Sequence, residues 1–468
     1  HVSRASLHNL NKFSAKIPMG TLTCVAGVSG SGKSTLVNHI IYEGLSNNSE
    51  SFTGKVSADK KFDEVILVDQ STVSKTPRSN PILYTDAWSP IKEALGRTEE
   101  SKLLGYVPGD FSFNSGNGRC EECNGLGYEV VEMQFLSDLQ IPCSYCSGMR
   151  FKDDILKIKY KDLSVSEILN LGVTEALYYF SDLPKTHRKL KLLQDVGLGY
   201  LSLGQPLNTL SGGESQRLKL VKFMGSLSKN KLPSILLIDE PTTGLHMKDV
   251  SLLVETLREI VKAGHSVIVV EHNMQILKNS DWILEMGPGA GVEGGKITAS
   301  GHPSSFANKV TLTSDFLYPK NSSNNLEVTN GKQKSRIIVG NKNLQILGAR
   351  ENNLKDVSLK IPHGKFVVIT GPSGSGKSSL AFDVVFAEGQ RRFMESMSAY
   401  ARQFVEQMSK PNVDRIEGMQ PTVAIEQRVT RGSRKSTVGS ITEIAQYLRL
   451  LYAKLGIQIS EVTGKPLE

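Results

Sequence analysis

The sequence has no apolar run of the roughly 20 residues that a helix needs to cross a membrane, and its start shows no signal-peptide pattern. These absences argue against an integral membrane protein and against an exported one. We therefore expect a cytoplasmic protein without a membrane partner. An initiating methionine is also missing, since the first residue is His1. The chain is accordingly expected to be a piece of a longer protein or an artificial rearrangement of one, so a domain absent here can lie elsewhere.

The bulk composition describes a soluble protein of more than one domain. A length of 468 residues exceeds what one compact core usually holds, so we expect two or three domains. Hydrophobic residues make up 39% and charged residues 22%, and 42 glycines indicate many turns. The net charge of +8 is compatible with nucleic acid, because lysine and arginine replace counterions along a phosphate backbone. An ordinary basic surface explains this charge equally well.

An internal repeat organises the chain. Residues 5–36 and 349–380 align without gaps at an offset of 344. Asn9, Leu10, Ile17, Pro18 and Gly20 of the first copy recur as Asn353, Leu354, Ile361, Pro362 and Gly364 of the second. This offset is far longer than the roughly 20 to 50 residues of a solenoid repeat, so a whole domain is duplicated. We predict one full domain over 1–320, a polar linker over 321–335 and the opening part of a second copy over 336–468.

Hydrophobic patterning predicts an α/β fold for the full domain. Four apolar runs look like buried strands, and the segment from Asp249 to Val261 has apolar residues at helical spacing. The expected strands are Thr21–Ala26, Glu64–Val68, Ser234–Ile238 and Ser266–Val270. Alternating strands and helices of this kind predict a largely parallel sheet covered by helices.

Each copy carries a phosphate-binding loop. The pattern G-x-x-x-x-G-K-[ST] occurs at residues 27–34 and again at 371–378, each time after an apolar run that we interpret as a strand. Its glycines let backbone N–H groups surround phosphate oxygens, and a lysine contacts the β- and γ-phosphates of ATP. The residues expected to hold ATP and Mg²⁺ are Gly27, Gly30, Gly32, Lys33, Ser34 and Thr35, then Gly371, Gly374, Gly376, Lys377, Ser378 and Ser379. A chance Gly/Ser loop is the alternative.

Two adjacent acids end the apolar run Ser234–Ile238. We expect Asp239 to bind Mg²⁺, usually through water, and Glu240 to orient or deprotonate the attacking water. Buried strands rarely end in neighbouring acids without a cation nearby. The alternative is a solvated strand end.

Three further motifs resemble those of ATP-binding cassettes. Leu210–Glu214 (LSGGE) resembles the signature sequence, which implies that Ser211, Gly212 and Gly213 contact the γ-phosphate held by an opposite cassette. Without the family, LSGGE is only a good helix cap. Gln70 resembles the glutamine of the Q-loop and His272 the switch histidine, while Gln427 in VAIEQ is the expected counterpart in the second copy. A lone glutamine or histidine is usually structural, but the order of these residues along the chain favours the functional interpretation.

Four of the five cysteines form two C-x2-C pairs. Cys120 and Cys123 are separated from Cys143 and Cys146 by 19 residues, a spacing that lets four thiolates close a tetrahedral Zn²⁺ site in a reducing compartment. Gly125 and Gly148 permit tight turns whose N–H groups can point at sulfur. Disulfides are the alternative, and Cys24 is expected to be a plain core residue.

A zinc module between the Q-loop and the signature is foreign to transporter cassettes, and here the chain resembles the UvrA family of the excinuclease system. The segments TPRSNPILYT, GDFSFNSGNGRCEECNGLG, LSLGQPLNTLSGGESQRLKL and IDEPTTGLH resemble its second cassette. GPSGSGKSSLAFDVVFAEGQRRFMESMSAYARQF resembles the start of its first cassette. The order is reversed relative to a single UvrA chain, which a piece of a fused double UvrA or an artificial rearrangement would explain.

The resemblance implies an ATPase of nucleotide excision repair. We expect it to bind damaged double-stranded DNA by recognising the shape and deformability of the duplex. The resemblance also implies a homodimer, a role in the SOS response and, in the intact protein, binding to a UvrB-like partner. No residue pattern indicates a nuclease centre. The insertion at about residues 76–160 supplies the candidate DNA contacts Arg78, Ser79, Asn80, Tyr84, Arg119 and Lys152, for each of which a solvated surface role is the alternative.

Smaller departures from the family pattern affect individual sites. Pro372 follows a loop glycine where leucine is more usual, and Asp110 and Lys435 stand where arginine is common. The loss of positive charge at Asp110 weakens any phosphate contact there. Two rival functions remain: a UvrA-like drug self-resistance protein acting as an ATP-switched binding module, and a membrane-transport ATPase, for which the zinc insertion has no use.

Overall fold

The computed structural model describes residues 1–46, 51–71, 73–74, 76–131, 139–226, 232–319, 343–395, 410–425, 437–460 and 463–466. The chain divides into two compact units, His1–Gln427 and Arg428–Glu468. The predicted linker at 321–335 lies outside the described residues, so the domain boundaries placed there stay predictions. Among the described residues no helix combines the length and the apolar character that crossing a bilayer requires.

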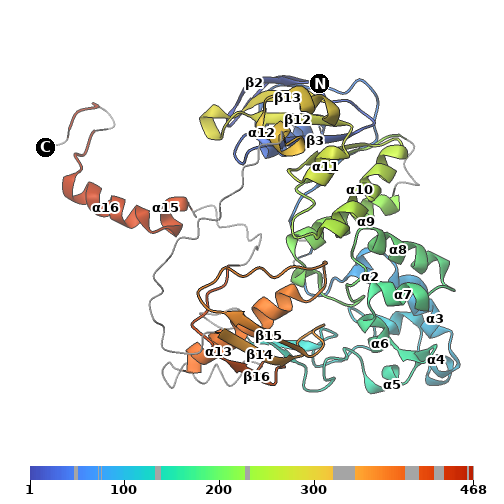
Figure 1. Cartoon of the computed structure of the whole chain (residues 1–468). Helices are drawn as coiled ribbons and strands as arrows, with labels where there is room; N and C mark the ends of the chain where they lie inside the picture. Colours follow the sequence, from blue (N-terminus) through green and yellow to red (C-terminus); the bar gives the residue numbers. More distant parts are fainter. Residues whose placement is uncertain are drawn as a thin grey trace. The chain divides into compact units, whose positions relative to one another are not determined.

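A six-stranded sheet forms the centre of the first copy. Its order is β13-β12-β3-β11-β10-β5, in which β12–β3, β3–β11, β11–β10 and β10–β5 are parallel and only the edge pair β12–β13 is antiparallel. The strands are β3 (Leu22–Gly27), β5 (Val65–Val68), β10 (Ile235–Asp239), β11 (Ser266–Val270), β12 (Trp282–Gly287) and β13 (Lys296–Gly301). Figure 1 shows the early blue strand and the late yellow strands side by side. The predicted largely parallel sheet is therefore confirmed.

A second, antiparallel sheet and a helix cover one face of this sheet. Strands β2 (Leu10–Ala15), β1 (Val2–Leu7) and β4 (Thr53–Val56) pair in that order. The helix after the phosphate loop is wound as a π-helix, η1 (Thr35–Ile41), and continues as α1 (Tyr42–Leu45). Leu36, Val37 and Ile40 of η1 are buried in one core with Val25 of β3 and Val270 of β11. This packing fixes the loop between β3 and η1 above the sheet.

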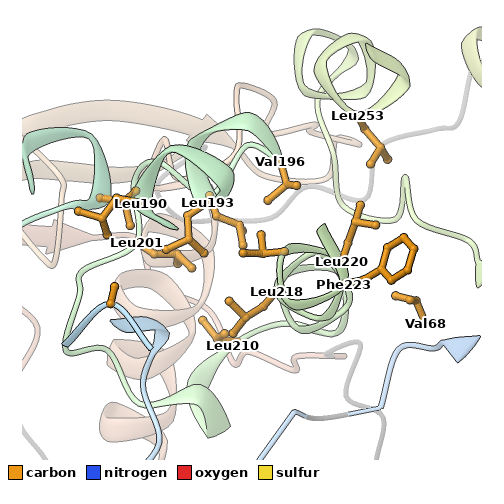
Figure 2. Close-up of a cluster of buried hydrophobic side chains, with 14 of the residues drawn as sticks. Val68, Leu190, Leu193, Val196, Leu201, Leu210, Leu218, Leu220, Phe223 and Leu253 are labelled. Carbon is orange, nitrogen blue, oxygen red and sulfur yellow. The ribbon is translucent and has the colours of Figure 1, made fainter. Parts of the chain in front are cut away.

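Helices and the cysteine-bearing insertion pack on the other side. Their largest elements are α3 (Trp88–Gly96), α8 (Pro184–Asp195), α9 (Gly212–Ser226) and α10 (Met247–Lys262). The remaining elements between β5 and α9 are α2 (Pro81–Tyr84), α4 (Glu99–Leu104), η3 (Pro108–Phe111), β6 (Tyr128–Val131), β7 (Leu139–Pro142), α5 (Asp153–Leu156), β8 (Lys159–Tyr160), β9 (Leu163–Ser164), α6 (Val165–Asn170), α7 (Val173–Tyr179) and η4 (Leu207–Thr209). Figure 2 shows how Leu218, Leu220 and Phe223 of α9 gather with side chains of α8, α10 and β5. These helices share a continuous apolar core with the sheet.

The first copy closes after α10 with short elements around β12 and β13. They are α11 (Met274–Lys278), η6 (Gly291–Glu293), η7 (Pro303–Asn308) and α12 (Leu312–Leu317). The predicted helix at Asp249–Val261 lies within α10 and is confirmed.

The second copy repeats the antiparallel sheet of the first. Strands β14 (Asn343–Ala349) and β15 (Val357–Pro362) pair with β16 (Arg415–Glu417) in the order β15-β14-β16. The pairs Val2↔Ala15 and Ala5↔Phe13 of β1 and β2 recur as Ile346↔Leu359 and Ala349↔Val357. Every one of these positions is shifted by the offset found in the sequence, so the duplication extends to strand register.

One prediction for the second copy is wrong. The sequence predicts a strand before its phosphate loop, but residues 366–370 form none, whereas the equivalent β3 of the first copy is a strand. In the first copy β3 pairs with β11 on one side and β12 on the other. The described part of the second copy supplies neither partner, and a β-strand needs one. Phe366 is 96% exposed and Val368 67%. The copy continues into η8 (Ser379–Phe386), again a π-helix, and α13 (Ala387–Glu395).

The second unit is small and helical. It contains α15 (Val438–Ile441) and α16 (Ile444–Leu455). The apolar side chains of α16, including Tyr447, Leu451 and Leu455, are exposed.

Candidate functional site

The first phosphate loop has the backbone shape that glycines allow. Gly27, Gly30 and Gly32 adopt φ values of 130°, 76° and 102°, which other residues rarely tolerate. A Cβ on Gly27 would lie 2.0 Å from the carbonyl oxygen of Met286, so the close approach to β12 also requires glycine. Ser34 and Thr35 begin the helix η1. The loop thus has the curved backbone and following helix start that suit an anion.

Lys33 lies folded into this loop. Its Nζ donates to the carbonyl oxygens of Gly27 and Val28, each at 2.9 Å, and its side chain is largely buried. Burial lowers the pKa of Lys33, while the nearby carboxylates of Glu240 and Asp239 act in the opposite direction. The ammonium group is therefore held in place by neutral oxygens next to two acids.

An asparagine braces the loop in both copies. Asn9 Nδ2 donates to Gly30 O at 3.1 Å and to Gly291 O at 3.2 Å, and its Oδ1 would be 2.9 Å from a Cβ on Gly32. In the second copy Asn353 Nδ2 donates to Gly374 O. This role was not predicted from the sequence, although both asparagines are among the repeated positions and could have been found there.

The two predicted acids lie at the carboxyl end of β10, Asp239 as its last residue and Glu240 directly after it. Asp239 Oδ2 accepts a hydrogen bond from Asn38 Nδ2 at 3.0 Å, which links the end of β10 to η1. Glu240 has a φ of 49°, a left-handed conformation that is unfavourable for a side chain of its kind. Its backbone N–H donates to Val270 O at 2.9 Å, so the strained residue is held at the carboxyl end of the sheet.

Gln70 and His272 are positioned by neighbouring groups. Gln70 Nε2 contacts Thr243 Oγ1 at 3.5 Å, and Thr243 Oγ1 in turn donates to Glu240 O at 3.0 Å. Gln70 thus joins the segment that follows the two acids. His272 is the second residue after β11, and its side chain is 74% exposed.

Glu271 is a residue that was not predicted from the sequence. It is fully buried, and its Oε1 accepts from the N–H and hydroxyl of Thr242 at 2.8 and 2.5 Å. Its Oε2 accepts from the N–H groups of His272 and Asn273 at 2.8 and 3.0 Å. One carboxylate therefore ties the segment after the two acids to the segment carrying His272. The signal that pointed to Asp239 and Glu240 was a pair of adjacent acids at the end of an apolar run, whereas Glu271 ends such a run as a single acid.

The signature sequence forms the N-terminus of α9. Ser211 and Glu214 make a reciprocal cap, since Ser211 N donates to Glu214 Oε2 at 2.8 Å and Glu214 N to Ser211 Oγ at 3.3 Å. A Cβ on Gly213 would lie 2.7 Å from Thr243 O, so a glycine is needed where the helix start meets the segment after β10. Gly212 is the first residue of the helix.

The second phosphate loop resembles the first and approaches the signature helix. Lys377 Nζ donates to Gly371 O and Pro372 O at 2.9 and 2.7 Å, as Lys33 does in the first loop. Ser373 N donates to Asp249 Oδ2 at 3.0 Å and Ser373 Oγ to Tyr200 Oη at 2.9 Å. Tyr200 Oη in turn donates to Glu214.

The other residues expected in the second phosphate loop have the same kind of backbone conformation as those of the first. Gly371, Gly374 and Gly376 have positive φ values of 152°, 73° and 89°, and Ser378 precedes the helix η8. Ser379 Oγ accepts from Asn352 Nδ2 at 3.1 Å. Gln427 and Lys435 lie outside the described residues.

The four paired cysteines come together. Cys120, Cys123, Cys143 and Cys146 are all buried, and their Sγ atoms lie within 4.8 Å of one another. The Cys123 and Cys146 Sγ atoms are 3.7 Å apart, close to the edge of a sulfur tetrahedron with metal–sulfur bonds of about 2.3 Å. None of the five cysteines is in a disulfide, and Cys24 is buried in the core of the sheet as predicted. The cluster is therefore compatible with zinc.

Tight turns support this cluster, and backbone N–H groups of these turns point at the sulfurs, as expected. Gly125 and Gly148 have φ values of 79° and 87°, and a Cβ on Gly125 would lie 1.9 Å from Phe113 O. Gly127 N donates to Cys123 Sγ at 3.2 Å, and backbone N–H groups of Glu122 and Tyr145 point at the sulfurs of Cys120 and Cys143.

The candidate DNA-contacting residues differ in how exposed their side chains are and in which protein groups they already contact. Asn80 is 1% exposed and caps α2 by accepting from Leu83 N at 3.1 Å, so it is a structural residue rather than a surface one. Tyr84 is half-buried below the ammonium of Lys222, whose Nζ is 5.2 Å from the ring centre. Lys152 pairs with Glu121 at 2.5 Å.

Two arginines of this set support loops near the cysteines. Arg78 donates to Asn124 O at 2.8 Å and Arg119 to Asn114 O at 2.5 Å, while Ser79 accepts from Leu207 N through its carbonyl oxygen at 2.8 Å. Asp110 is buried and accepts from Val107 N at 2.9 Å, so its charge serves a turn.

Similar proteins give these features a common context. No protein-family profile matches the sequence. The chain is 46% identical over 323 residues to UvrABC system protein A of Clostridium perfringens, an alignment covering 68% of this chain and 34% of that protein. The crystal structure of UvrA2 from Deinococcus radiodurans superposes with a TM-score of 0.62 at 38% identity, covering 68% of this chain and 39% of the other. The chain belongs to the UvrA family of ATP-binding cassette ATPases.

The order of segments also has a counterpart among UvrA relatives. UvrABC system protein A of Chlamydia trachomatis is 36% identical over 470 residues, which is 100% of this chain but only 26% of that protein. The second-type cassette followed by the start of a first-type cassette is therefore not peculiar to this chain. The alignments span between a quarter and about a third of the length of these curated relatives, 26% for the Chlamydia protein and 34% for the Clostridium one.

Proposed function

We propose that this chain is the part of a UvrA protein that couples ATP binding and hydrolysis to the recognition of distorted double-stranded DNA in nucleotide excision repair. The observation that carries the proposal is the combination of a cysteine cluster with a cassette ATP site in one folded unit. Lys33, Asp239, Glu240 and Gln70 converge at the carboxyl end of the parallel sheet, and the cysteines lie in the insertion that follows Gln70. The names of the relatives support the assignment to the excision system.

Each residue of the proposed ATP site would have a separate role in ATP hydrolysis. The backbone N–H groups of residues 30–34 and the Lys33 ammonium would bind the β- and γ-phosphates. Ser34 and Asp239 would hold Mg²⁺, which supplies charge neutralisation at these phosphates. Glu240 would accept a proton from the attacking water, and Gln70 would orient that water. Ser211, Gly212 and Gly213 would contact the nucleotide of another cassette.

The insertion would grip the DNA. Zn²⁺ held by the four cysteines would fix the turns around Gly125 and Gly148 and so the surface beside them. Arg78, Arg119 and Lys152 are the candidate phosphate contacts, each already hydrogen-bonded to a neighbouring turn or acid that sets its direction. Phosphate contacts position the protein, whereas the shape and deformability of the duplex report damage. Incision would fall to partners, including a UvrB-like protein bound by the intact chain, and a homodimer would supply opposing cassettes.

A DNA-binding experiment tests this proposal. Duplexes with and without a single bulky lesion are titrated with the chain, with and without ATP, at several salt concentrations. We expect tighter binding to the lesion duplex and a steep loss of affinity as salt rises, with Arg78→Ala and Lys152→Ala each reducing the salt slope by about one unit. Lys278→Ala, at an exposed position of α11, is the control. Equal binding at low and high salt, or no preference for the lesion in any ATP state, would contradict the proposal and favour the drug-resistance alternative.

A further inference from the structure

One face of the signature helix carries two polar side chains that reach back to the ATP site. Gln216 and Lys219 are three residues apart on α9, so they lie on the same face. Gln216 is 1% exposed, and its Nε2 donates to Val68 O at 3.1 Å and to Asp239 O at 2.6 Å. Lys219 Nζ donates to Asp69 O at 3.1 Å, to Asp69 Oδ1 at 2.5 Å and to Ser71 Oγ at 2.8 Å. All three donors of the ammonium are therefore used.

The acceptor atoms of these bonds belong to two segments, the one around Gln70 and the one at the end of β10, which carry the proposed catalytic side chains. Asp69 and Ser71 flank Gln70 on either side, and Ser71 Oγ also donates to Asp69 Oδ1 at 2.6 Å. Asp239 is the acid at the end of β10. A single helix face is thus attached to both sides of the ATP site, by Gln216 at the strand ends and by Lys219 around Gln70.

The apolar side chains of α9 pack into the hydrophobic core. Leu218, Leu220 and Phe223 are buried, and Figure 2 shows them among side chains of α8, α10 and β5. Close-packed cores move as bodies rather than deform continuously. A displacement of Lys219 would therefore move α9 as a rigid body, including its capped N-terminus at Ser211–Glu214.

Gln70 itself is held loosely. Its side-chain contact to Thr243 Oγ1 is at the 3.5 Å limit of a hydrogen bond, so reorientation of its side chain costs little. Its two neighbours, by contrast, are bound firmly to Lys219. Any movement of the Gln70 segment must therefore either break the Lys219 contacts or carry α9 with it.

We propose that Lys219 is a positioning residue that transmits nucleotide occupancy at the Lys33 site to the signature sequence through Asp69 and Ser71. The inference rests on the proposed ATPase function. When Gln70 turns toward bound Mg·ATP, its flanking residues move the Lys219 ammonium, and the N-terminus of α9 shifts toward or away from the nucleotide of another cassette. Gln216 acts as the fixed point of this movement, because its acceptors are backbone oxygens at strand ends.

Hydrogen exchange of the full 468-residue chain tests the proposal directly. Exchange at residues 211–216 and 28–34 is measured with and without Mg·ATP in wild type, Lys219→Met, Lys219→Arg and Lys222→Met. Methionine keeps an unbranched stem but removes all three donors, arginine restores the charge, and Lys222 is an exposed residue of the same helix. We expect ATP to protect residues 28–34 in every variant and to change exchange at 211–216 in all except Lys219→Met. The same substitution should lower kcat on the order of tenfold with little change in KM, the size typical of a coupling between sites.

A second variant separates this coupling from a simple loss of stability. Asp69→Asn removes the carboxylate and keeps the backbone acceptor, and with Lys219→Met it completes a double-mutant cycle in which the two effects on kcat should not add. A merely structural lysine would instead lower the melting temperature while leaving the ATP-dependent change at 211–216 intact, and that result would overturn the proposal. If wild type shows protection at 28–34 but none at 211–216, the inference alone fails. If even residues 28–34 are unprotected, the proposed ATPase function fails with it.

Discussion

Glu240 combines a proposed catalytic role with a backbone conformation that costs energy. A side chain in the left-handed region costs about 1–3 kcal/mol and persists only where surrounding contacts enforce it. The hydrogen bond from Glu240 N to Val270 O and that from Thr243 to Glu240 O are such contacts. The Glu240 carboxylate lies near enough to Lys33 to oppose the lowering of the Lys33 pKa by burial.

We predict that Glu240→Gln lowers the rate of ATP hydrolysis by on the order of 10²-fold or more while ATP binding survives. Glutamine has the shape of glutamate but cannot accept the proton of the attacking water. The measurement is phosphate release under saturating ATP together with equilibrium binding of a fluorescent nucleotide. Glu255→Gln, at an exposed position of α10, should behave as wild type, and brisk hydrolysis by Glu240→Gln would show that the base is misassigned.

At the scale of single residues the sequence predicts roles only for side chains whose motif is local. Lys33, Asp239 and Ser211 were predicted because each lies in a short pattern with a known spacing. Glu271, Lys219 and Tyr200 were not, because their roles depend on partners that are far away in the chain: Glu271 bonds Thr242, and Lys219 bonds Asp69. Asn80 was misread as a surface residue, since a cap and a surface amide look alike in sequence.

The cysteine cluster is the element whose stability a bound Zn²⁺ would raise most. Around it lie short strands and turns, and the buried group that joins the four cysteines contains only Leu126 as an additional packed side chain among the described residues. Four thiols without a metal offer little packing energy, so the turns on either side would be weakly held.

We predict about one zinc per purified chain, lost on Cys143→Ala, because a three-thiolate remnant binds the ion more weakly. Retention should also fall in acid, since the ligands must lose protons to bind. Elemental analysis of the dialysed protein measures this, and Cys24→Ala, which removes a cysteine of the central core, serves as the control that keeps its zinc. A folded wild type free of metal would refute the assignment.

At the scale of elements the four strands predicted for the first copy match β3, β5, β10 and β11 to within a residue at each end, because continuous apolar runs mark buried parallel strands. Strands β12 and β13 of the same sheet were not predicted. The second copy shows the limit of that method. Residues 366–370 have the apolar pattern of β3 yet form no strand among the described residues, because pairing is a non-local property. Its antiparallel sheet was not predicted, although the repeat implied that it would match β1 and β2.

For the whole molecule the number of signature sequences sets a constraint on hydrolysis. The sequence contains one LSGGE motif, at Leu210–Glu214, and two phosphate loops. The loop of the second copy contacts Tyr200 and Asp249, near that signature. In a single chain the Lys33 site therefore has acids but no opposing signature, and the Lys377 site has no pair of acids of its own in this sequence.

We predict that turnover per chain rises with protein concentration, because a second chain can offer its signature to the Lys33 site. Steady-state hydrolysis over a wide range of chain concentrations, compared with the oligomeric state measured by light scattering, tests this. Adding an excess of the Glu240→Gln chain, which still carries an intact signature, should stimulate dilute wild type. Rates per chain that stay constant across the whole range would exclude cooperation between chains.

The apolar run at residues 366–370 has a consequence for how the chain behaves outside its intact protein. Phe366 and Val368 are mostly exposed, and Val367 and Ile369 are 44% and 40% exposed. Five consecutive residues of high strand propensity with no charge among them are a template for intermolecular strand addition. Aggregation should therefore begin at this point of the surface, ahead of unfolding elsewhere. During synthesis the same run would stay accessible to chaperones for as long as no strand pairs with it.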